Sequence, residues 1–166
     1  TRMDPAVSVD IGGSHTCAID ARGSVWCWGS NQFHQSGTRS VRPVLSPALT
    51  KAPASASVAL GETFSCSLGK DRIIRCWGRN DSAQLGIPRG RSRIAPVRVR
   101  GGNYIGITAG EKYACATRST GTTWCWGDNA FGQLANGGLV PKWMPQKVMN
   151  APTTGSISAV AAGARH

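Results

Sequence analysis

The sequence contains no run of about 18 or more consecutive apolar residues, so it predicts no membrane-spanning helix. It also lacks a positively charged and then apolar leader, and its first residue is Thr1 instead of Met. We therefore expect a chain that begins inside a longer gene product, either as a mature secreted form or as a fragment. The missing leader does not argue against export.

Acidic residues are scarce, with 8 Asp and Glu against 19 Lys and Arg. The acids are scattered, with no close pair spaced for acid-base catalysis and no cluster of oxygen ligands for calcium. No serine lies in a nucleophile elbow, and no glycine-rich loop leads from a strand into a helix, because no helical pattern is evident. The sequence therefore predicts a protein that is not an enzyme and needs no cofactor.

The net charge of +11 favours acidic partners such as nucleic acid, anionic polysaccharide or acidic protein surfaces. Much of the excess lies between Lys70 and Arg100. Within it, Arg89, Arg91 and Arg93 have two interpretations. As a binding site they form a basic loop for phosphate, sulfate or carboxylate, since guanidinium groups offer paired donors. As a structural feature they belong to a solvated loop, which the unchanged repeat length favours.

Glycine and proline are abundant, with 21 and 9 residues, and predict an all-β fold with many turns. The tripeptide Cys-Trp-Gly occurs three times at intervals of 49 residues. A fixed period of this length indicates a repeat architecture. The positions in phase are Gly12, Gly61 and Gly110; Cys17, Cys66 and Cys115; Trp28, Trp77 and Trp126; Asn31, Asn80 and Asn129; Gln35, Gln84 and Gln133; Pro47, Pro96 and Pro145.

Each unit contains four strand-like pieces, and the fourth follows the periodic proline, which suits the start of an outer strand. Four short antiparallel strands per unit describe a β-propeller blade. We predict repeats at about 7–55, 56–104 and 105–157, with 158–166 as the first strand of a fourth blade. The chain 1–166 then forms part of a single propeller domain and cannot close a ring alone.

The cysteines of each unit are ten residues apart, which places them opposite each other in a hairpin that turns about Arg22 in the first unit. Gly23 takes the left-handed position of that turn, whereas Arg72 stands there in the second unit and predicts a different turn. Opposed residues lie close enough for a disulfide after modest adjustment. The predicted pairs are Cys17 with Cys27, Cys66 with Cys76, and Cys115 with Cys125.

Two alternatives to these disulfides are zinc ligation and free buried thiols. Zinc ligands usually come in pairs two to four residues apart, and these cysteines do not. Three disulfides would imply an oxidising compartment, hence an extracellular or cell-surface location or a periplasm. Within the same tripeptide, the tryptophan points to the opposite face and can fill the gap between blades, while the following Asn and Gln secure the loop.

His15 and Trp143 could belong to a functional site, but the residues at the equivalent positions of the other repeats favour a packing role for both. His15 aligns with Phe64 and Tyr113, so it is predicted to pack and not to act as a general base. Trp143 aligns with Leu45 and an isoleucine, so it is also predicted to pack. Asn80 begins a glycosylation sequon, but the same position in the other units has the Asn without the sequon, which favours a structural role.

The combined motif resembles the regulator of chromosome condensation repeat, in the cysteine-bearing form of exported bacterial proteins and receptor ectodomains. It is carried by "GGSHTCAIDARGSVWCWGSNQFHQSG", "GETFSCSLGKDRIIRCWGRNDSAQLG" and "GEKYACATRSTGTTWCWGDNAFGQLANG". The resemblance implies a propeller, usually of seven blades in that family. It implies no functional residue here, because that family has many functions on one fold.

We therefore expect an extracellular or cell-surface scaffold, without enzymatic activity, that binds a protein partner or further blades of the same propeller. Recognition is expected from loops that differ between units, since the periodic positions maintain the fold. The alternatives are recognition of an anionic glycan by the arginine-rich segment, intracellular binding of chromatin or a GTPase regulator, and inhibition of an enzyme by a propeller face. The intracellular alternative predicts reduced thiols. Because disulfides are predicted here instead, nucleic acid is a less favoured partner.

Overall fold

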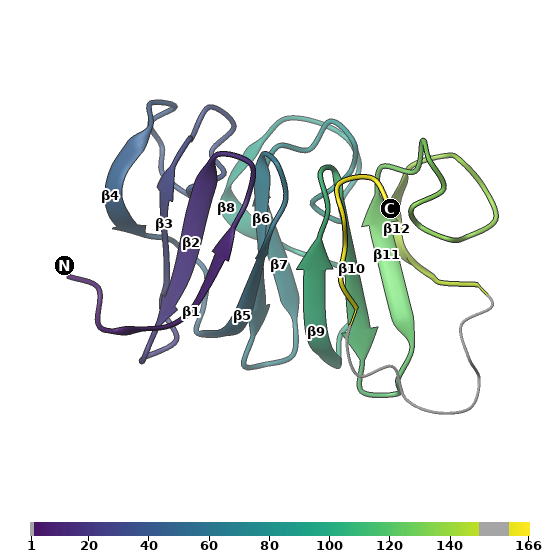
Figure 1. Ribbon diagram of the computed structural model, residues 1–166, viewed down its shortest axis with the longest axis horizontal. Coiled ribbons are helices and arrows are strands. Elements are labelled where there is room, and N and C mark those ends of the chain that lie inside the picture. The colour runs from purple at the N-terminus through teal and green to yellow at the C-terminus, as the bar shows by residue number, and fades with distance from the viewer. Residues whose placement is uncertain (1, 150–159) are drawn as a thin grey trace.

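The computed structural model describes residues 2–149 and 160–166, and its described part is all-β. Three four-stranded antiparallel sheets lie side by side along the long axis of the molecule (Figure 1). The first sheet contains β1 (Ala6–Ile11), β2 (His15–Asp20), β3 (Val25–Gly29) and β4 (Val44–Leu49). The second contains β5 (Ser55–Leu60), β6 (Phe64–Gly69), β7 (Ile74–Gly78) and β8 (Arg93–Arg98). The third contains β9 (Tyr104–Ala109), β10 (Tyr113–Arg118), β11 (Thr123–Gly127) and β12 (Lys142–Lys147).

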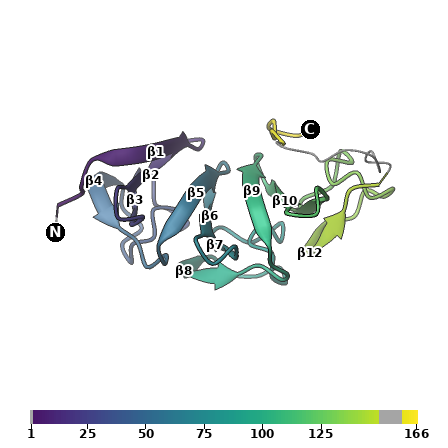
Figure 2. The ribbon, with the colours of Figure 1, turned by 90° about the horizontal axis from the view of Figure 1, so that it is seen from below.

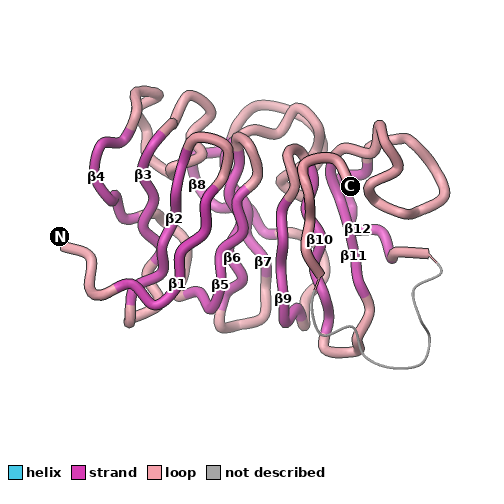
Figure 3. Tube along the Cα trace, in the orientation of Figure 1, coloured by secondary structure: helices cyan, strands magenta, loops and turns pink. Residues whose placement is uncertain are grey.

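Each sheet is a propeller blade, because its strands pair in sequence order and the whole unit recurs along the chain. We call them blades 1, 2 and 3. The strands β1, β5 and β9 lie on one side of the arc and the strands β4, β8 and β12 on the other (Figure 2). Strand and loop segments alternate through the described chain (Figure 3). The predicted fold of three blades is therefore confirmed.

The segment 160–166 continues the pattern beyond blade 3. The backbone N–H of Glu62 donates to the carbonyl of Glu111 at 3.1 Å, and the N–H of Glu111 donates in the same way to Ala164 at 2.9 Å. Val160 and Ala162 also pack against the core of blade 3. This segment thus occupies the place of a fourth inner strand. Residues 158 and 159 of the predicted strand lie outside the described residues.

The turn between the second and third strands is the same in all three blades, so the different turn predicted at Arg72 is wrong. Gly23 and Gly121 have φ of 90° and 76°, and Arg72 has φ of 59°. Each donates its N–H to the residue three positions earlier, at 2.8 to 2.9 Å. A left-handed arginine costs roughly 1 to 2 kcal/mol, and the hydrogen bonds of the turn and hairpin offset this cost.

The periodic proline lies inside the outer strand and not at its start, which corrects the predicted boundary. Pro47 is the fourth residue of β4, and blades 2 and 3 repeat this placement. The ladder between β3 and β4 shifts register between Cys27 and Gly29, opposite this part of β4. Because β4 is also an edge strand, the missing proline N–H breaks no hydrogen bond that the sheet needs.

Candidate binding surfaces

The disulfides of the three hairpins lie on one face of each blade. The structure joins Cys17 to Cys27 and forms the other two predicted pairs in the same register. In blade 1 this pair packs with Ile19 and Val25 against residues from blade 2. We call this the trailing face, because it contacts the blade that follows in the chain. All six cysteines are paired.

The opposite face of each blade contacts the preceding blade, and we call it the leading face. In blade 2 it presents Val58, Leu60 and Trp77 to blade 1. The indole Nε1 of Trp77 donates to the main-chain carbonyl of Gln35 at 2.9 Å, and Trp126 donates to Gln84 at 3.0 Å. Each repeated tryptophan therefore both fills the gap between blades and forms a hydrogen bond across it.

The repeated glycines allow the blades to approach closely at the other end of this interface. A Cβ on Gly61 would lie 2.7 Å from the carbonyl oxygen of Gly110, and a Cβ on Gly110 would lie 2.5 Å from that of Gly163. Gly12 faces the carbonyl of Gly61 in the same way. Packing therefore requires glycine at this position of every repeat, since no side chain fits between neighbouring backbones.

The repeated Asn and Gln secure the loop after the third strand. The Asn80 Oδ1 accepts the N–H of Leu85 at 3.2 Å, and its Nδ2 donates to the carbonyl of Pro88 at 2.7 Å. Asn31 and Asn129 accept N–H groups five residues ahead in the same way. Asn80 is fully buried with its amide nitrogen engaged, which is the arrangement of a structural residue and not of an accessible glycan acceptor.

His15 is buried between blades 1 and 2. Its Nε2 lies 2.8 Å from the hydroxyl of Ser65, which itself donates to the carbonyl of Gln35 at 2.8 Å. Because the serine proton is used, the network assigns the proton to Nε2, and Nδ1 is buried without a partner among the described residues. Burial lowers the pKa of His15 to about 4. The ring packs as a neutral group, and its one recorded side-chain hydrogen bond is to the neutral Ser65 hydroxyl.

The leading face of blade 1 has no blade against it among the described residues. Val9 and Ile11 of β1 are 60% and 72% exposed, whereas their repeat equivalents Val58 and Leu60 are 8% and 5% exposed. Trp28 is only half-buried, and its indole nitrogen has no hydrogen-bond partner in the described part of the chain. This surface has the same residue types that join the other blades.

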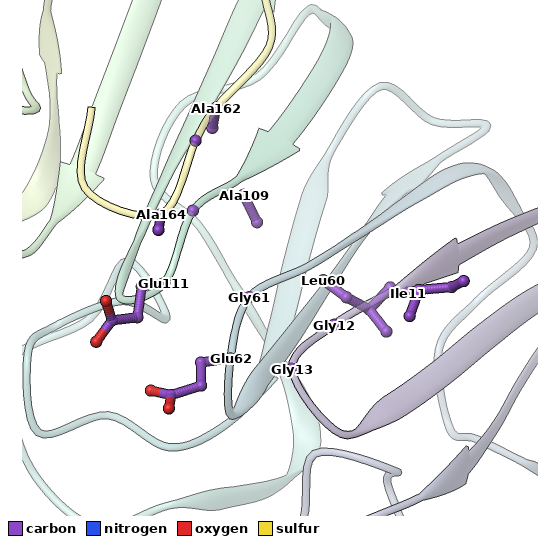
Figure 4. Close-up of a pocket in the computed structure, with 12 residues that line it drawn as sticks. Ile11, Gly12, Gly13, Leu60, Gly61, Glu62, Ala109, Glu111, Ala162 and Ala164 are labelled. Atoms are coloured by element: carbon purple, nitrogen blue, oxygen red, sulfur yellow. The ribbon is translucent and has the colours of Figure 1, made fainter.

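A cavity of about 350 Å³ lies where the first strands of successive blades end (Figure 4). Its walls are mainly Gly12, Gly61 and short apolar side chains, and Glu62 and Glu111 lie at its edge. The sequence analysis missed this pairing of two carboxylates, although each directly follows a repeated glycine. A side-chain hydrogen bond from Arg165 is the main cause that holds the pKa of Glu111 below its usual range, despite desolvation.

Acid-base chemistry is not supported at this cavity. The hydrogen bond from Arg165 favours the charged form of Glu111, which makes this carboxylate a poor proton donor. In residues 2–149 and 160–166, no group of three or more His, Cys, Asp and Glu is placed to hold a metal ion. The lining of the cavity is suited to a small apolar or cationic group.

The outer strands carry two features that the sequence analysis singled out. Leu45 is 93% exposed and Trp143 is 36% exposed, so the packing role predicted for Trp143 from its repeat equivalents is not found at either residue. Arg89, Arg91 and Arg93 are also exposed, on the loop before β8 and at the start of that strand. The outer strand of a blade has no neighbouring strand on one side, so alternating residues there lack a packing surface.

Comparisons with known proteins agree with this arrangement. Two sequence profiles of the regulator of chromosome condensation (RCC1) repeat match the chain, one at residues 6–35 and 104–133 and the other at 22–68 and 120–166. No curated protein matches the sequence significantly.

Solved structures show the same fold at low sequence identity. Prp20p of Saccharomyces cerevisiae is 23% identical with a TM-score of 0.81, over 89% of this chain and 39% of that one. Human WBSCR16 is 23% identical with a TM-score of 0.81, over 95% of this chain and 42% of that one. The receptor kinase CR4 ectodomain of Physcomitrella patens is 23% identical with a TM-score of 0.58, over 96% of this chain and 34% of that one. The chain therefore spans less than half the length of each.

Proposed function

Because the chain belongs to the regulator of chromosome condensation repeat family, we propose that it is an extracellular or cell-surface propeller scaffold that binds a protein partner and catalyses no reaction. The single observation that carries this proposal is the uncovered leading face of blade 1. A group of apolar side chains exposed together on one surface usually marks a site that another protein surface covers. No helix in the described residues has the length and hydrophobicity that a membrane crossing requires.

The proposed occupant of this face is the trailing face of a further repeat unit. Both internal interfaces join the same two faces through an indole-to-carbonyl hydrogen bond and apolar contacts from the inner strand. Val9, Ile11 and Trp28 provide the same groups for a third such interface. In the purified protein, a second copy of the chain supplies that partner when β1 of the first copy replaces segment 160–166 against blade 3 of the second.

Sedimentation equilibrium tests this interface. The oxidised protein is expected to have a mean mass above 17.4 kDa that rises with concentration. The double variant Val9→Glu and Ile11→Glu is expected to remain at the monomer mass, because two charges cannot be buried unpaired between blades. The matched control is Leu45→Glu, at an exposed leucine on the outer strand of the same blade. A wild-type protein that stays monomeric, or equal dissociation by the control, would contradict the proposal.

The proposed location follows from the three disulfides, which persist in oxidising compartments and are rare in the cytosol. The solved structures of similar fold include both an ectodomain and Prp20p, whose binding to Gsp1p and histones has been described. Fold alone therefore does not choose the compartment. Disulfide pairing is what favours the extracellular scaffold over the chromatin and GTPase alternative.

Alkylation of the unreduced protein from its natural source tests the location. We expect no cysteine to be modified under denaturing conditions, and peptide mapping to recover the three hairpin pairs. Prior reduction should make all 6 cysteines reactive, which is the internal control. If all are already reactive without reduction, the protein comes from a reducing compartment, and binding to nucleic acid or an intracellular protein should be tested instead.

A further inference from the structure

Basic and acidic residues are separated across the width of each blade. The outer strand and its flanking residues occupy 38–51, 87–100 and 136–149 in the three blades, and these segments contain no Asp or Glu. Every acid of the chain lies elsewhere. The segments hold ten basic residues: Arg39, Arg42, Lys51, Arg89, Arg91, Arg93, Arg98, Arg100, Lys142 and Lys147. The outer side of the arc is therefore positively charged without nearby compensation.

Half of these cations belong to blade 2, and we call them the arginine strip: Arg89, Arg91, Arg93, Arg98 and Arg100. All are exposed, and none forms an ion pair with an acid in the described structure. Two acids of the same blade already have partners, since Asp71 pairs with Arg75 and Asp81 with Arg79, and the third, Glu62, lies at the cavity where the first strands end. Arg100 has one side-chain contact, with the Met144 sulfur at 3.4 Å.

The strip is long and lies on a convex surface. Arg93 and Arg98 are at the two ends of β8, so about five residues of extended strand separate them by roughly 16 Å. β8 lies on the outer side of the arc (Figure 2). The cavity where the first strands end is not lined by any of these arginines, and neither is a second cavity, which lies between Phe131 and Arg165. A single compact anion would contact only part of the strip, whereas a linear polyanion can follow it.

The chemistry of the strip distinguishes among polyanions. Residues 87–100 contain five arginines, no lysine and no aromatic residue. A guanidinium group binds sulfate or carboxylate through two parallel hydrogen bonds. Sequence-tolerant binding of single-stranded nucleic acid usually adds stacking of bases on aromatic side chains, for which this strip has no platform. The disulfides further favour an extracellular polymer.

We propose that the outer edge of blade 2 binds a linear sulfated or carboxylated polysaccharide through the arginine strip. This site is separate from the leading face proposed to bind a further repeat unit. The choice of polysaccharide over nucleic acid rests partly on the proposed extracellular location, and the experiment below separates the two polymers directly.

The test measures binding of a fluorescent heparin fragment by anisotropy over a range of salt concentrations. The triple variant Arg89→Gln, Arg91→Gln and Arg93→Gln is expected to weaken binding by about tenfold or more at low salt. The slope of log affinity against log salt should decrease in magnitude by about 2 to 3, because fewer counterions are released. The corresponding triple variant Arg89→Lys, Arg91→Lys and Arg93→Lys keeps the charge but removes the planar donors. Its affinity for heparin should lie between that of wild type and that of the triple Gln variant.

The control removes the same charge at exposed sites outside the strip, with Arg2→Gln, Arg22→Gln and Lys70→Gln. Its affinity is expected to change by less than about twofold if position matters more than net charge. The proposal would be refuted if the control variant weakened binding as much as the triple Gln variant of the strip, or if wild type did not bind heparin at low salt. An oligothymidylate of equal charge that binds more tightly than heparin would overturn the choice of polysaccharide.

Discussion

Trp77→Ala is expected to lower the free energy of unfolding by about 3 to 5 kcal/mol, and Trp28→Ala to lower it by clearly less. Trp77 is completely buried between blades 1 and 2 and donates to the Gln35 carbonyl. Its loss leaves a large cavity and removes one of the two hydrogen bonds that the Gln35 carbonyl accepts, the other being from the Ser65 hydroxyl. Trp28 occupies the same position in its repeat but lies on the uncovered leading face.

Urea unfolding at low protein concentration provides the measurement, because association would partly bury Trp28. The comparison is internal, since both substitutions remove the same side chain after the same cysteine in the same tripeptide. Trp126→Ala should resemble Trp77→Ala, because Trp126 is also fully buried and donates to Gln84. Equal costs at all three tryptophans in the monomeric protein would mean that Trp28 is packed without a further repeat unit, and would remove the main support for the proposed binding role of this face.

The periodic features of the fold could be predicted because each repeat specifies them independently. The register of the hairpin follows from the ten-residue spacing of its cysteines, and the structure pairs Cys17 with Cys27 as expected. The role of tryptophan between blades follows from its position next to the cysteine on the opposite face of the strand. A pattern that recurs three times makes an accidental match improbable, so these predictions did not depend on any single unit.

The errors occurred where local preference and tertiary context disagree. Arg72 has a poor intrinsic preference for a left-handed turn, but the flanking strands and their paired cysteines impose that turn. The proline was expected to begin a strand because it lacks a donor, yet an edge strand beside a bulge tolerates it in the middle. In both cases the hairpin or sheet as a whole determines the conformation of one residue.

The binding surfaces were the least predictable part, because they depend on which residues have no neighbour. Val9 and Val58 are the same residue type at the same repeat position, and only the presence of a preceding blade makes one buried and the other exposed. Glu62 and Glu111 are also distant in sequence but line one cavity. The arginine strip was visible in the sequence, but the absence of an acid partner required the structure.

Lowering the pH from 7 to 4 is expected to reduce the stability of the wild-type protein by up to about 3 kcal/mol through His15. Burial lowers the pKa of His15 to about 4, whereas the imidazole has a pKa of 6.5 in the unfolded chain. The unfolded state therefore binds a proton first as the pH falls. The stability that the neutral ring provides is complete above pH 6.5 and is lost progressively toward pH 4.

His15→Phe is expected to remove this dependence, because Phe64 occupies the equivalent position of blade 2 and does not titrate. The measurement is the difference in unfolding free energy between the two proteins at several pH values. His15→Tyr, which copies the equivalent Tyr113 of blade 3, provides a second variant if the first does not fold. Parallel curves for wild type and both variants would show that the His15 ring is accessible to protons in the folded state.

The loss of stability between pH 7 and pH 4 comes mainly from His15, because the carboxylates with lowered pKa values become protonated at lower pH. The side-chain hydrogen bond from Arg75 is the largest cause that lowers the pKa of Asp71, and Arg165 does the same for Glu111. Their contributions to stability are lost between the ordinary carboxyl pKa and these lowered values, which lie below most of the pH range in which His15 acts. If protonated, the His15 ring would place a second N–H at a buried Nδ1 that has no acceptor in the described structure. Acid should therefore loosen the contact between blades 1 and 2 before it affects the contact between blades 2 and 3, where Phe64 faces Ala114 in place of this pair.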